Sequence, residues 1–364
     1  MTEMNRRELL QLGVAAIGAT TLPSIARGQG APAPNATATA VAKPTRPIRI
    51  DAYSRTLHWL RKPEEVAAAC HQIGNSTIDL TIRNYPGHVL PEKAKTDLPI
   101  WVKALKQHGV EVTSIAADIT DAKTPFVEDI LGTMQSLGIR HHWWRGMGGF
   151  DNTKPYGPQI EALKPRLAEL VKLDEKYNTK AMYHPQGGPF FDYLELIRNF
   201  DPKYVSLHFD TGHWMQIAQS NMASMIMWAG PYVGGFVWKD EVVEKGEPPA
   251  TAVGTPAAPP AAAQGAAPAA TGRGRGGGGR GGSVNGFRTR QVPVGTGMVD
   301  FTLAAQALKN INFEGPTECQ PEWTGLGGAE SGRDTLTLAP DVVIGLLKRD
   351  YDTIHAALVA AGAA

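Results

Sequence analysis

The chain contains little cysteine. Only Cys70 and Cys319 occur in 364 residues, and they are far apart in the sequence. One pair cannot form the disulfide framework of a small secreted domain, and no Cys-x-x-Cys or Cys/His cluster has the spacing of a structural zinc site. We expect two buried thiols, with a single disulfide as the alternative. Stability must then come from a hydrophobic core, for which an apolar content of 42% is sufficient.

The chain also lacks an excess of charge of either sign. Its 36 basic and 35 acidic residues give a net charge of +1. General electrostatic attraction to nucleic acid or to an anionic membrane is therefore not expected.

Several motifs of common enzyme classes are absent as well. The sequence has no Gly-rich Walker loop, no Gly-x-Ser-x-Gly elbow and no His-Glu-x-x-His pair. These absences argue against a P-loop nucleotide-binding enzyme, an α/β-hydrolase and a zinc metalloprotease of that class.

The N-terminus has the organisation of an export signal. Arg6 and Arg7 precede an apolar run from Leu9 to Leu22, and small residues and prolines follow. This pattern predicts a signal peptide over residues 1–30, similar to twin-arginine (Tat) signals, and a Pro/Ala/Thr-rich linker over 31–45. The apolar run is too short for a stable membrane span, and no cysteine near its end offers a lipid anchor. We expect a periplasmic or secreted protein without a stable membrane anchor.

From Ile48 onward, short β-rich runs alternate with longer helical patterns. The expected strands are 47–53, 77–82, 111–117, 139–145, 179–184, 203–210, 232–239 and 315–320. The expected helices are 63–73, 92–109, 124–137, 158–177, 190–199, 214–228, 300–311 and 335–361. Eight such units predict an α/β protein with a single (β/α)8 TIM barrel over residues 46–362. A doubly wound sheet is the alternative, but no Gly-x-Gly-x-x-Gly follows the first strand.

Residues 246–286 interrupt this alternation. They are almost wholly Pro, Ala, Gly, Thr and Arg and end in a glycine run that contains arginines. Such a composition cannot bury enough apolar surface to fold, so we expect a disordered insertion after the seventh strand. An RGG-type nucleic-acid tail is the alternative reading, but the segment has no interleaved aromatic residues. No nucleic-acid partner is expected.

In a TIM barrel, active sites form where strands end and βα loops begin. Period-two alternation places His208 and Asp210 on one face of the sixth strand, and His213 follows within one turn. This spacing lets Asp210 and His213 reach one cation. His184 ends the fifth strand and precedes Gln186 and two glycines, so it is a further candidate ligand.

The last strand carries three polar residues on one face, Glu318, Gln320 and Glu322. Polar side chains inside a barrel need partners, and a cation or a polyhydroxyl substrate would supply them. We expect Gln320 near the metal and Glu322 as a proton-transfer group, although a solvated loop would suit Glu322 equally well.

Other polar and aromatic residues at strand ends are candidates for substrate contact. Lys239 ends the seventh strand, and its ammonium group is suited to stabilise an enolate oxygen; a surface ion pair with Asp240 is the alternative. The remaining candidates are Arg83, His88, His58, Trp59 and Trp238, with Trp143 and Trp144 as further aromatic faces. Each aromatic residue is equally suited to the core.

Several short motifs, in this order and spacing, resemble a known family. They are Thr77–Arg83 with Pro86–Glu92 and Asp97–Pro99, Phe209–His213, Trp238–Asp240, Gly295–Phe301, Gly315–Glu322 and Leu347–Asp350. Together they cover most of residues 47–360 and look like the sugar phosphate isomerase/epimerase-like branch of the xylose-isomerase-like TIM barrels.

This resemblance implies a divalent metal ion, Mn²⁺, Mg²⁺, Co²⁺ or Zn²⁺, held at the ends of strands five to eight. Asp210 matches the aspartate ligand of the family, and His213 matches the histidine of its Asp-x-x-His motif. His184 stands where many members have glutamate, Gln320 where glutamate or histidine is common, and Val237 where many have histidine. Neither of the two glutamates that act as paired acid and base in family epimerases thus stands where that mechanism requires it.

The sequence therefore predicts an exported, metal-dependent sugar isomerase or epimerase that works through an enediolate, with His213, Lys239 and Glu322 as its catalytic residues. A lyase or hydratase acting on keto-sugars or keto-glycosides, and a non-catalytic sugar-binding barrel, are the alternatives. The sequence is compatible with a homo-oligomer, and it names neither the substrate nor the metal.

Overall fold

The computed structural model describes residues 46–364, except 149, 152, 186–189, 218–220 and 246–286. The expected signal peptide 1–30, the linker 31–45, the insertion 246–286 and Gln186 lie outside the described residues.

Eight parallel strands close into a barrel, with the order β1-β10-β7-β6-β5-β4-β3-β2. The strands are β1 (Ile50–Tyr53), β2 (Thr77–Ile82), β3 (Glu111–Ile119), β4 (His141–Trp144), β5 (Lys180–Tyr183), β6 (Val205–Asp210), β7 (Val233–Trp238) and β10 (Thr317–Cys319). The predicted TIM barrel is thereby confirmed. Each expected strand range overlaps one barrel strand, and β3 extends two residues beyond its expected end at 117.

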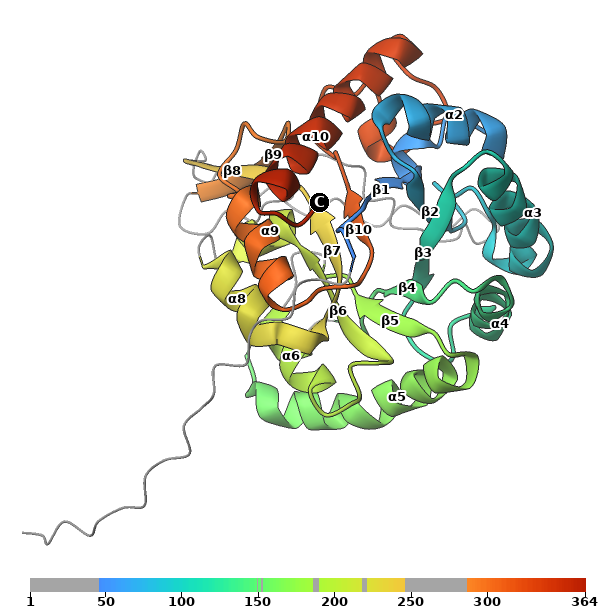
Figure 1. Ribbon diagram of the computed structural model, residues 1–364. Coiled ribbons are helices and arrows are strands. Elements are labelled where there is room, and N and C mark those ends of the chain that lie inside the picture. Colours follow the sequence, from blue (N-terminus) through green and yellow to red (C-terminus); the bar gives the residue numbers. More distant parts are fainter. Residues whose placement is uncertain (1–45, 149, 152, 186–189, 218–220, 246–286) are drawn as a thin grey trace, which may run out of the picture. The chain divides into compact units, whose positions relative to one another are not determined.

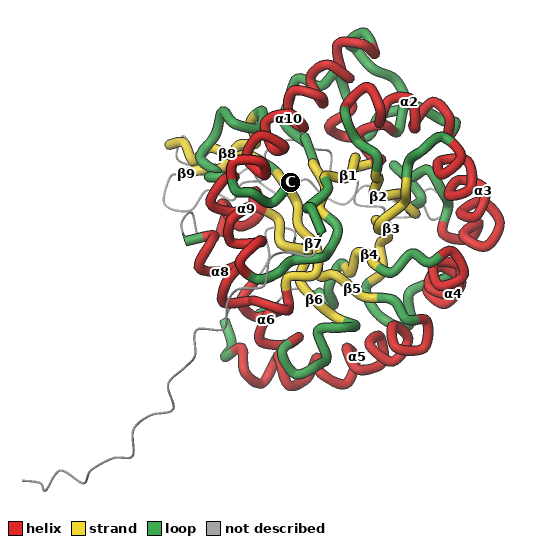
Figure 2. Tube along the Cα trace, in the orientation of Figure 1, coloured by secondary structure: helices red, strands yellow, loops and turns green. Residues whose placement is uncertain are grey.

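Helices surround the strands (Figures 1 and 2). They are α2 (Pro63–Ile73), α3 (Ala94–Gln107), α4 (Val127–Leu137), α5 (Tyr156–Tyr177), α6 (Phe190–Ile197), α7 (Thr211–Ile217), α8 (Met222–Ala229), α9 (Phe301–Asn310) and α10 (Pro340–Ala360). Short 3-10 turns cover Ser54–Leu57, Pro91–Lys93, Gly230–Tyr232 and Ala329–Ser331. Two helix ends follow directly from glycine, because Gly74 and Gly138 take φ values of 117° and 74° as left-handed caps of α2 and α4.

One expectation was wrong in detail. The single helix expected at 214–228 is divided, since α7 ends at Ile217 and α8 begins at Met222 after Asn221, whose φ is 59°. The segment 246–286 comes after the seventh strand in the chain, as expected. It is flanked by an antiparallel pair that was not predicted, β8 (Asp240–Lys245) and β9 (Phe287–Val292), which is separate from the barrel sheet.

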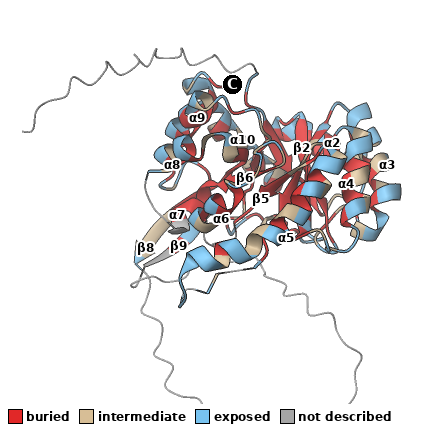
Figure 3. Ribbon diagram, turned by 90° about the horizontal axis from the view of Figure 1, so that it is seen from below, coloured by how far each residue is buried: buried red, intermediate tan, exposed pale blue. Residues whose placement is uncertain are grey.

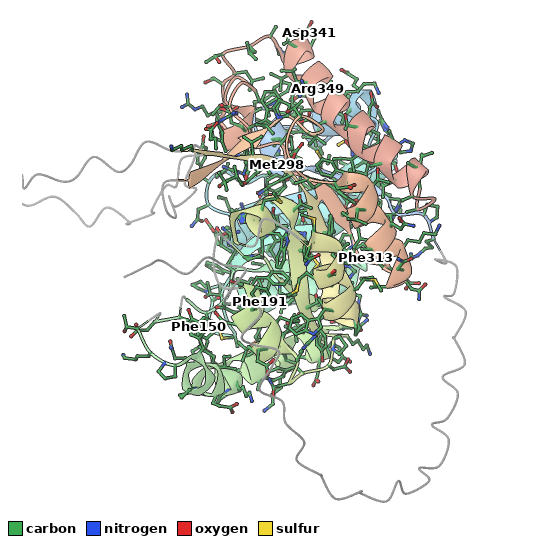
Figure 4. The ribbon with its side chains drawn as sticks, turned by 90° about the vertical axis from the view of Figure 1, so that its left-hand side faces the viewer. Phe150, Phe191, Met298, Phe313, Asp341 and Arg349 are labelled. Carbon is green, nitrogen blue, oxygen red and sulfur yellow. The ribbon has the colours of Figure 1, made fainter. Side chains whose placement is uncertain are left out.

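The carboxylate of Asp240 fixes the chain where it returns from this pair. It accepts hydrogen bonds from the backbone N–H groups of Gly295, Gly297 and Val299, at 2.9, 2.7 and 3.2 Å. Met298 lies beside the hairpin (Figure 4), and its sulfur accepts a hydrogen bond from the Val243 N–H. The segment that resembles the family in sequence therefore forms a tight loop around one carboxylate.

The core lies inside the barrel and between the strands and helices, whose outer faces are exposed (Figure 3). Cys70 and Cys319 are both buried free thiols, as expected. No helix in the described part of the chain combines the length and the apolar content that a membrane crossing requires.

Candidate functional site

Three side chains from neighbouring strands converge at the carboxyl ends of the barrel strands. Asp210 is the last residue of β6, His184 directly follows β5, and His213 lies in the first turn of α7. One ligand atom of each lies within 4.8 Å of the others. The Asp210 Oδ2 atom is 3.5 Å from His213 Nε2 and 3.8 Å from His184 Nε2. The structure thus brings together three of the four residues expected to bind metal.

Asp210 also organises the start of α7. Its Oδ1 atom accepts a hydrogen bond from the His213 N–H at 3.1 Å, which satisfies one of the free donors at a helix N-terminus. Gly212 permits a close approach at this point, because a Cβ atom there would lie 3.1 Å from Cβ of Lys239. The same carboxylate therefore positions His213 and presents its second oxygen to the site.

Lys239 lies between two carboxylates. Its Nζ atom is 2.9 Å from Asp210 Oδ2 and 3.0 Å from Glu322 Oε2, while its side chain is only 2% exposed. Burial alone would lower the pKa of Lys239, but the two carboxylates raise it above its usual value. Lys239 is therefore a fixed cation in this site. It is paired with Asp210 and Glu322, and not with Asp240 at the surface.

Glu322 is held by cations on both sides, since Arg55 pairs with its other oxygen. Burial alone would raise the pKa of Glu322, but Lys239 and Arg55 lower it to about 2. A carboxylate with such a low pKa is a weak proton acceptor at neutral pH. In this state the main role of Glu322 is to hold Lys239 and Arg55.

The imidazoles of the site are neutral at pH 7. Burial lowers the pKa of His184 well below its usual value, that of His208 to about 3 and that of His213 to about 4. Among the described residues, the Nδ1 atoms of His184 and His208 have no hydrogen-bond partner. Trp143 holds His184 in place, since the two rings stack with centroids 4.1 Å apart. Neutral, oriented imidazoles are the form that binds a metal.

A second polar group lies inside the barrel. The Gln320 amide donates a hydrogen bond to Glu318, and His208 Nε2 is 3.6 Å from the same Glu318 oxygen. Burial raises the pKa of Glu318, with Asp79 as the next cause. Gln320 is thus engaged by its amide nitrogen within the barrel.

Arginine side chains face the site from β2 and β4. The guanidinium carbons of Arg83 and Arg145 lie 4.8 and 5.6 Å from the centre of the Trp143 ring. The Arg83 Nη1 group donates to the Tyr53 hydroxyl at 3.2 Å. Burial, and then Arg83, lower the pKa of Arg145 to about 10, but both arginines stay charged at neutral pH.

The other described residues that were predicted to contact substrate lie in two separate places. His58 and His88 form an edge-to-face pair, with ring centroids 5.5 Å apart, and Trp59 follows His58 with its indole N–H unpartnered. Trp238 instead lies in the layer between the barrel and α9, where its indole donates to Thr317 and its ring contacts Phe301.

Sequence reasoning overlooked Arg55, Arg145 and Asp118. Arg145 is the residue after β4, and it ends the strand expected at 139–145, so the strand-end rule applied to it as well. Arg55 lies in the 3-10 turn after β1 and offered no such signal, because its partner Glu322 is far away in sequence.

A hollow of about 570 Å³ opens at the opposite, amino-terminal end of the strands and is lined by residues such as Arg49, Glu111 and Phe313. The His184/Asp210/His213 group takes no part in its lining. In TIM barrels this face serves stability rather than catalysis, so the carboxyl-terminal end remains the candidate site.

Comparison with solved structures finds similar barrels at low identity. An L-ribulose 3-epimerase matches with a TM-score of 0.53 and 14% identity, over 86% of this chain and 96% of that one. The IOLI protein with a bound zinc atom matches with a TM-score of 0.57 and 15% identity, over 85% and 99%. The 3-keto-D-glucoside 4-epimerase YcjR of E. coli matches with 0.52 and 14%, over 79% and 97%. Such likenesses establish the fold alone.

No curated protein sequence matches the chain. The model of the xylose isomerase-like TIM barrel family matches residues 67–338, which is most of the chain and includes β2, the site residues on β5, β6, β7 and β10, and the loop around Asp240. This protein therefore belongs to the xylose isomerase-like TIM barrel family.

Proposed function

We propose that this protein is an exported, metal-dependent sugar isomerase or epimerase that acts at the carbon next to a carbonyl group. The observation that carries the proposal is the convergence of His184, Asp210 and His213 at the carboxyl end of the barrel. Support also comes from family membership and from neighbours that are named as sugar epimerases.

The donor set fits a divalent metal. Two neutral imidazoles and one carboxylate form a set that zinc accepts while keeping an open position for substrate, and the zinc-bound neighbour has the same fold. Ligands of a tetrahedral zinc ion lie roughly 3.3 Å apart, close to the 3.5 and 3.8 Å that separate the two histidine nitrogens from Asp210 Oδ2. In the described part of the chain, the buried Oδ2 atom of Asp210 accepts no hydrogen bond, although it forms an ion pair with Lys239.

When bound, such an ion would polarise a substrate carbonyl and favour loss of the neighbouring proton. Lys239 is placed to stabilise the negative charge that develops on the sugar oxygen. As Lys239 turns toward that oxygen, its pairing with Glu322 weakens, and the pKa of Glu322 rises because Lys239 is the strongest of the groups that lower it. Glu322 is then suited to accept the proton and to return it.

Metal analysis and proton exchange test this proposal. We expect the purified protein to bind about one divalent ion and to exchange a carbon-bound proton of a keto-sugar for deuterium in D₂O. An Asp210→Asn variant should lose both properties, whereas Asp352→Asn on the exposed face of α10 should keep both. Absence of exchange across ketoses and keto-glycosides, in protein that has bound metal, would contradict the enzyme proposal.

The same experiment separates the alternatives. A lyase or hydratase would also exchange the proton, but it would release or add a group at the neighbouring carbon. A sugar-binding barrel without catalysis would show binding but no exchange, and its affinity would survive Asp210→Asn.

Export is proposed from the sequence alone, from Arg6, Arg7 and the apolar run that follows. Expression of the full chain in a bacterium, with and without an Arg6→Lys/Arg7→Lys double substitution, tests it. We expect the native chain in the periplasm or the medium. Retention of the native chain inside the cell would contradict the prediction.

A further inference from the structure

We propose that Arg83 and Arg145 form a binding subsite for an anionic group on the sugar, a carboxylate or a phosphate ester. This inference rests on the proposed function, because it assigns the substrate class of the same site. Arg83 directly follows β2 and Arg145 directly follows β4, the two strands on either side of β3.

The donor groups of these two side chains are incompletely paired. Arg83 is buried, yet among the described residues its Nε and Nη2 groups have no hydrogen-bond partner, and neither has Nη1 of Arg145. The Nη1 group of Arg83 donates to the Tyr53 hydroxyl. Buried guanidinium donors without partners are costly, and a planar carboxylate or a phosphate has the geometry that satisfies them.

The two guanidinium groups share a single ion-pair partner among the described residues. Asp118 is their shared ion-pair partner, with Oδ1 at 3.4 Å from Nε of each arginine, and its side chain is 60% exposed. The buried Asp79 also interacts electrostatically with Arg83, but burial raises the pKa of Asp79 to about 6. Burial is the largest cause of the lowered pKa of Arg145, and the positive charge of Arg83 is the next, because the two cations repel each other. An anion between them would relieve that repulsion.

Two other carboxylates of the site form their ion pairs with other cations. Glu322 is paired with Arg55 and Lys239, and Asp210 with Lys239. A divalent ion at His184, Asp210 and His213 would add further positive charge at the same end of the barrel. An anionic substrate is therefore favoured over a neutral one, and the preference should weaken as salt is added.

Arg83 and His184 also lie close to one aromatic ring. The Arg83 guanidinium carbon and the His184 ring centroid are 4.8 and 4.1 Å from the centroid of the Trp143 ring. We therefore place the charged end of a sugar at the arginines when its carbonyl end lies near His184. This arrangement would fix which end of the molecule meets Lys239.

Calorimetry with the full chain tests the subsite directly. D-glucuronate, D-glucose 6-phosphate and D-glucose are titrated into native protein, Arg145→Gln, Arg145→Lys and Arg83→Gln. We expect native protein to bind one of the charged sugars about tenfold to hundredfold more tightly than glucose. The tighter of the two identifies carboxylate or phosphate as the group. Arg145→Gln and Arg83→Gln should lose this preference with little change for glucose, and Arg145→Lys should keep part of it.

Arg198→Gln is the matched control. Arg198 also lies over a tryptophan, with its guanidinium carbon 3.8 Å from the Trp228 ring centre, but it belongs to the exposed outer layer after α6. Its loss should leave the preference for charged sugars unchanged. Equal binding of glucose and both charged sugars to the native protein, or an unchanged preference in Arg145→Gln, would overturn the proposal.

A measurement on the native protein covers the case in which the variants do not fold. Phenylglyoxal modifies accessible arginines, and mass spectrometry locates the products. We expect the charged sugar to protect Arg145 but not Arg198, and glucose to protect neither. Protection that is equal for glucose and the charged sugars would also reject the subsite.

The subsite and the proposed function fail in different ways. Asp210→Asn should abolish metal binding and proton exchange while the preference for the charged sugar persists in metal-free protein. If native protein binds no metal and exchanges no proton but keeps the preference, the enzyme proposal fails and the anion subsite stands. If the native protein exchanges the proton of neutral and charged sugars equally fast, and the arginine variants do the same, the subsite fails and the enzyme proposal stands.

Discussion

The indole ring of Trp143 lies nearly parallel to the imidazole of His184, with centroids 4.1 Å apart and an angle of 24° between the planes. The indole N–H also donates to the buried Asp79 at 3.1 Å. Trp143 thus connects a candidate metal ligand to a hydrogen bond deep in the barrel. Groups that orient a metal ligand contribute to metal affinity although they do not touch the ion.

We expect Trp143→Ala to weaken binding of the metal about tenfold to hundredfold and to destabilise the protein by about 3–5 kcal/mol. Trp143→Phe keeps an aromatic face against His184, so most of the metal affinity should return although the hydrogen bond to Asp79 is lost. Calorimetric metal titration and urea unfolding measure the two effects. Equal metal affinity in all three proteins would show that the ring serves packing alone.

Lys239→Met should separate metal binding from turnover. Removal of the ammonium group 2.9 Å from Asp210 leaves more negative charge for the ion, so we expect metal affinity to rise. Turnover should fall by about a hundredfold to a thousandfold, because the cation that stabilises the enediolate oxygen is gone. Metal titration and kcat with a keto-sugar test both. Unchanged kcat would remove Lys239 from the mechanism.

Asp240→Ala should loosen the loop around Gly297 without disturbing the barrel. Four backbone N–H groups, those of Glu241, Gly295, Gly297 and Val299, lose a charged acceptor, and we expect a loss of about 2–4 kcal/mol of unfolding free energy. Amide exchange should accelerate at Gly295, Gly297 and Val299. As a control, Asp300→Ala removes only the hydrogen bond to the Leu303 N–H at the start of α9, which is worth about 1 kcal/mol. Similar losses in both variants would argue against the special role of Asp240.

Asp51→Asn should make stability less dependent on pH. Burial raises the pKa of Asp51 to about 7 from 3.8, with Thr113 and Thr77 opposing the rise. The unfolded chain therefore releases this proton at lower pH than the folded protein does, and stability is lost as pH rises from about 4 to 7. We expect the variant to match native protein near pH 4 and to exceed it at pH 8 by up to about 4 kcal/mol. Thermal unfolding across this range measures it, and parallel curves for the two proteins would contradict the raised pKa.

The barrel could be predicted because its elements repeat and because their signals are local. Strand and helix alternation, Gly74 and Gly138 at helix ends and Pro63 at a helix start are all readable from neighbouring residues. The hairpin β8–β9 escaped prediction since its two strands are separated by residues 246–286, which leaves no turn signal between them. The division between α7 and α8 escaped because the apolar residues on its two sides were assigned to one helix, although Gln219, Ser220 and Asn221 interrupt them and Asn is a known N-cap residue type.

The site was predictable to the extent that strand ends define it. His184, Asp210 and His213 were found by that rule and do come together. The state of Glu322 was not predictable, because its pKa depends on Arg55 and Lys239, which meet it only in the folded chain. Trp238 was a candidate for substrate contact and neighbours Lys239 in sequence. Alternation along β7 instead points its side chain into the layer between the barrel and α9.

The β8–β9 hairpin allows the chain length between its two strands to vary. Its register runs without a break from Asp240 opposite Val292 to Lys245 opposite Phe287, so the chain leaves and re-enters the barrel at adjacent points. The length of the segment between the strands is thereby uncoupled from barrel geometry, and a longer loop adds little closure entropy. The hairpin offers a natural place to insert a tag or a whole domain, or to shorten the chain for crystallisation, close to the mouth of the site and without altering its walls.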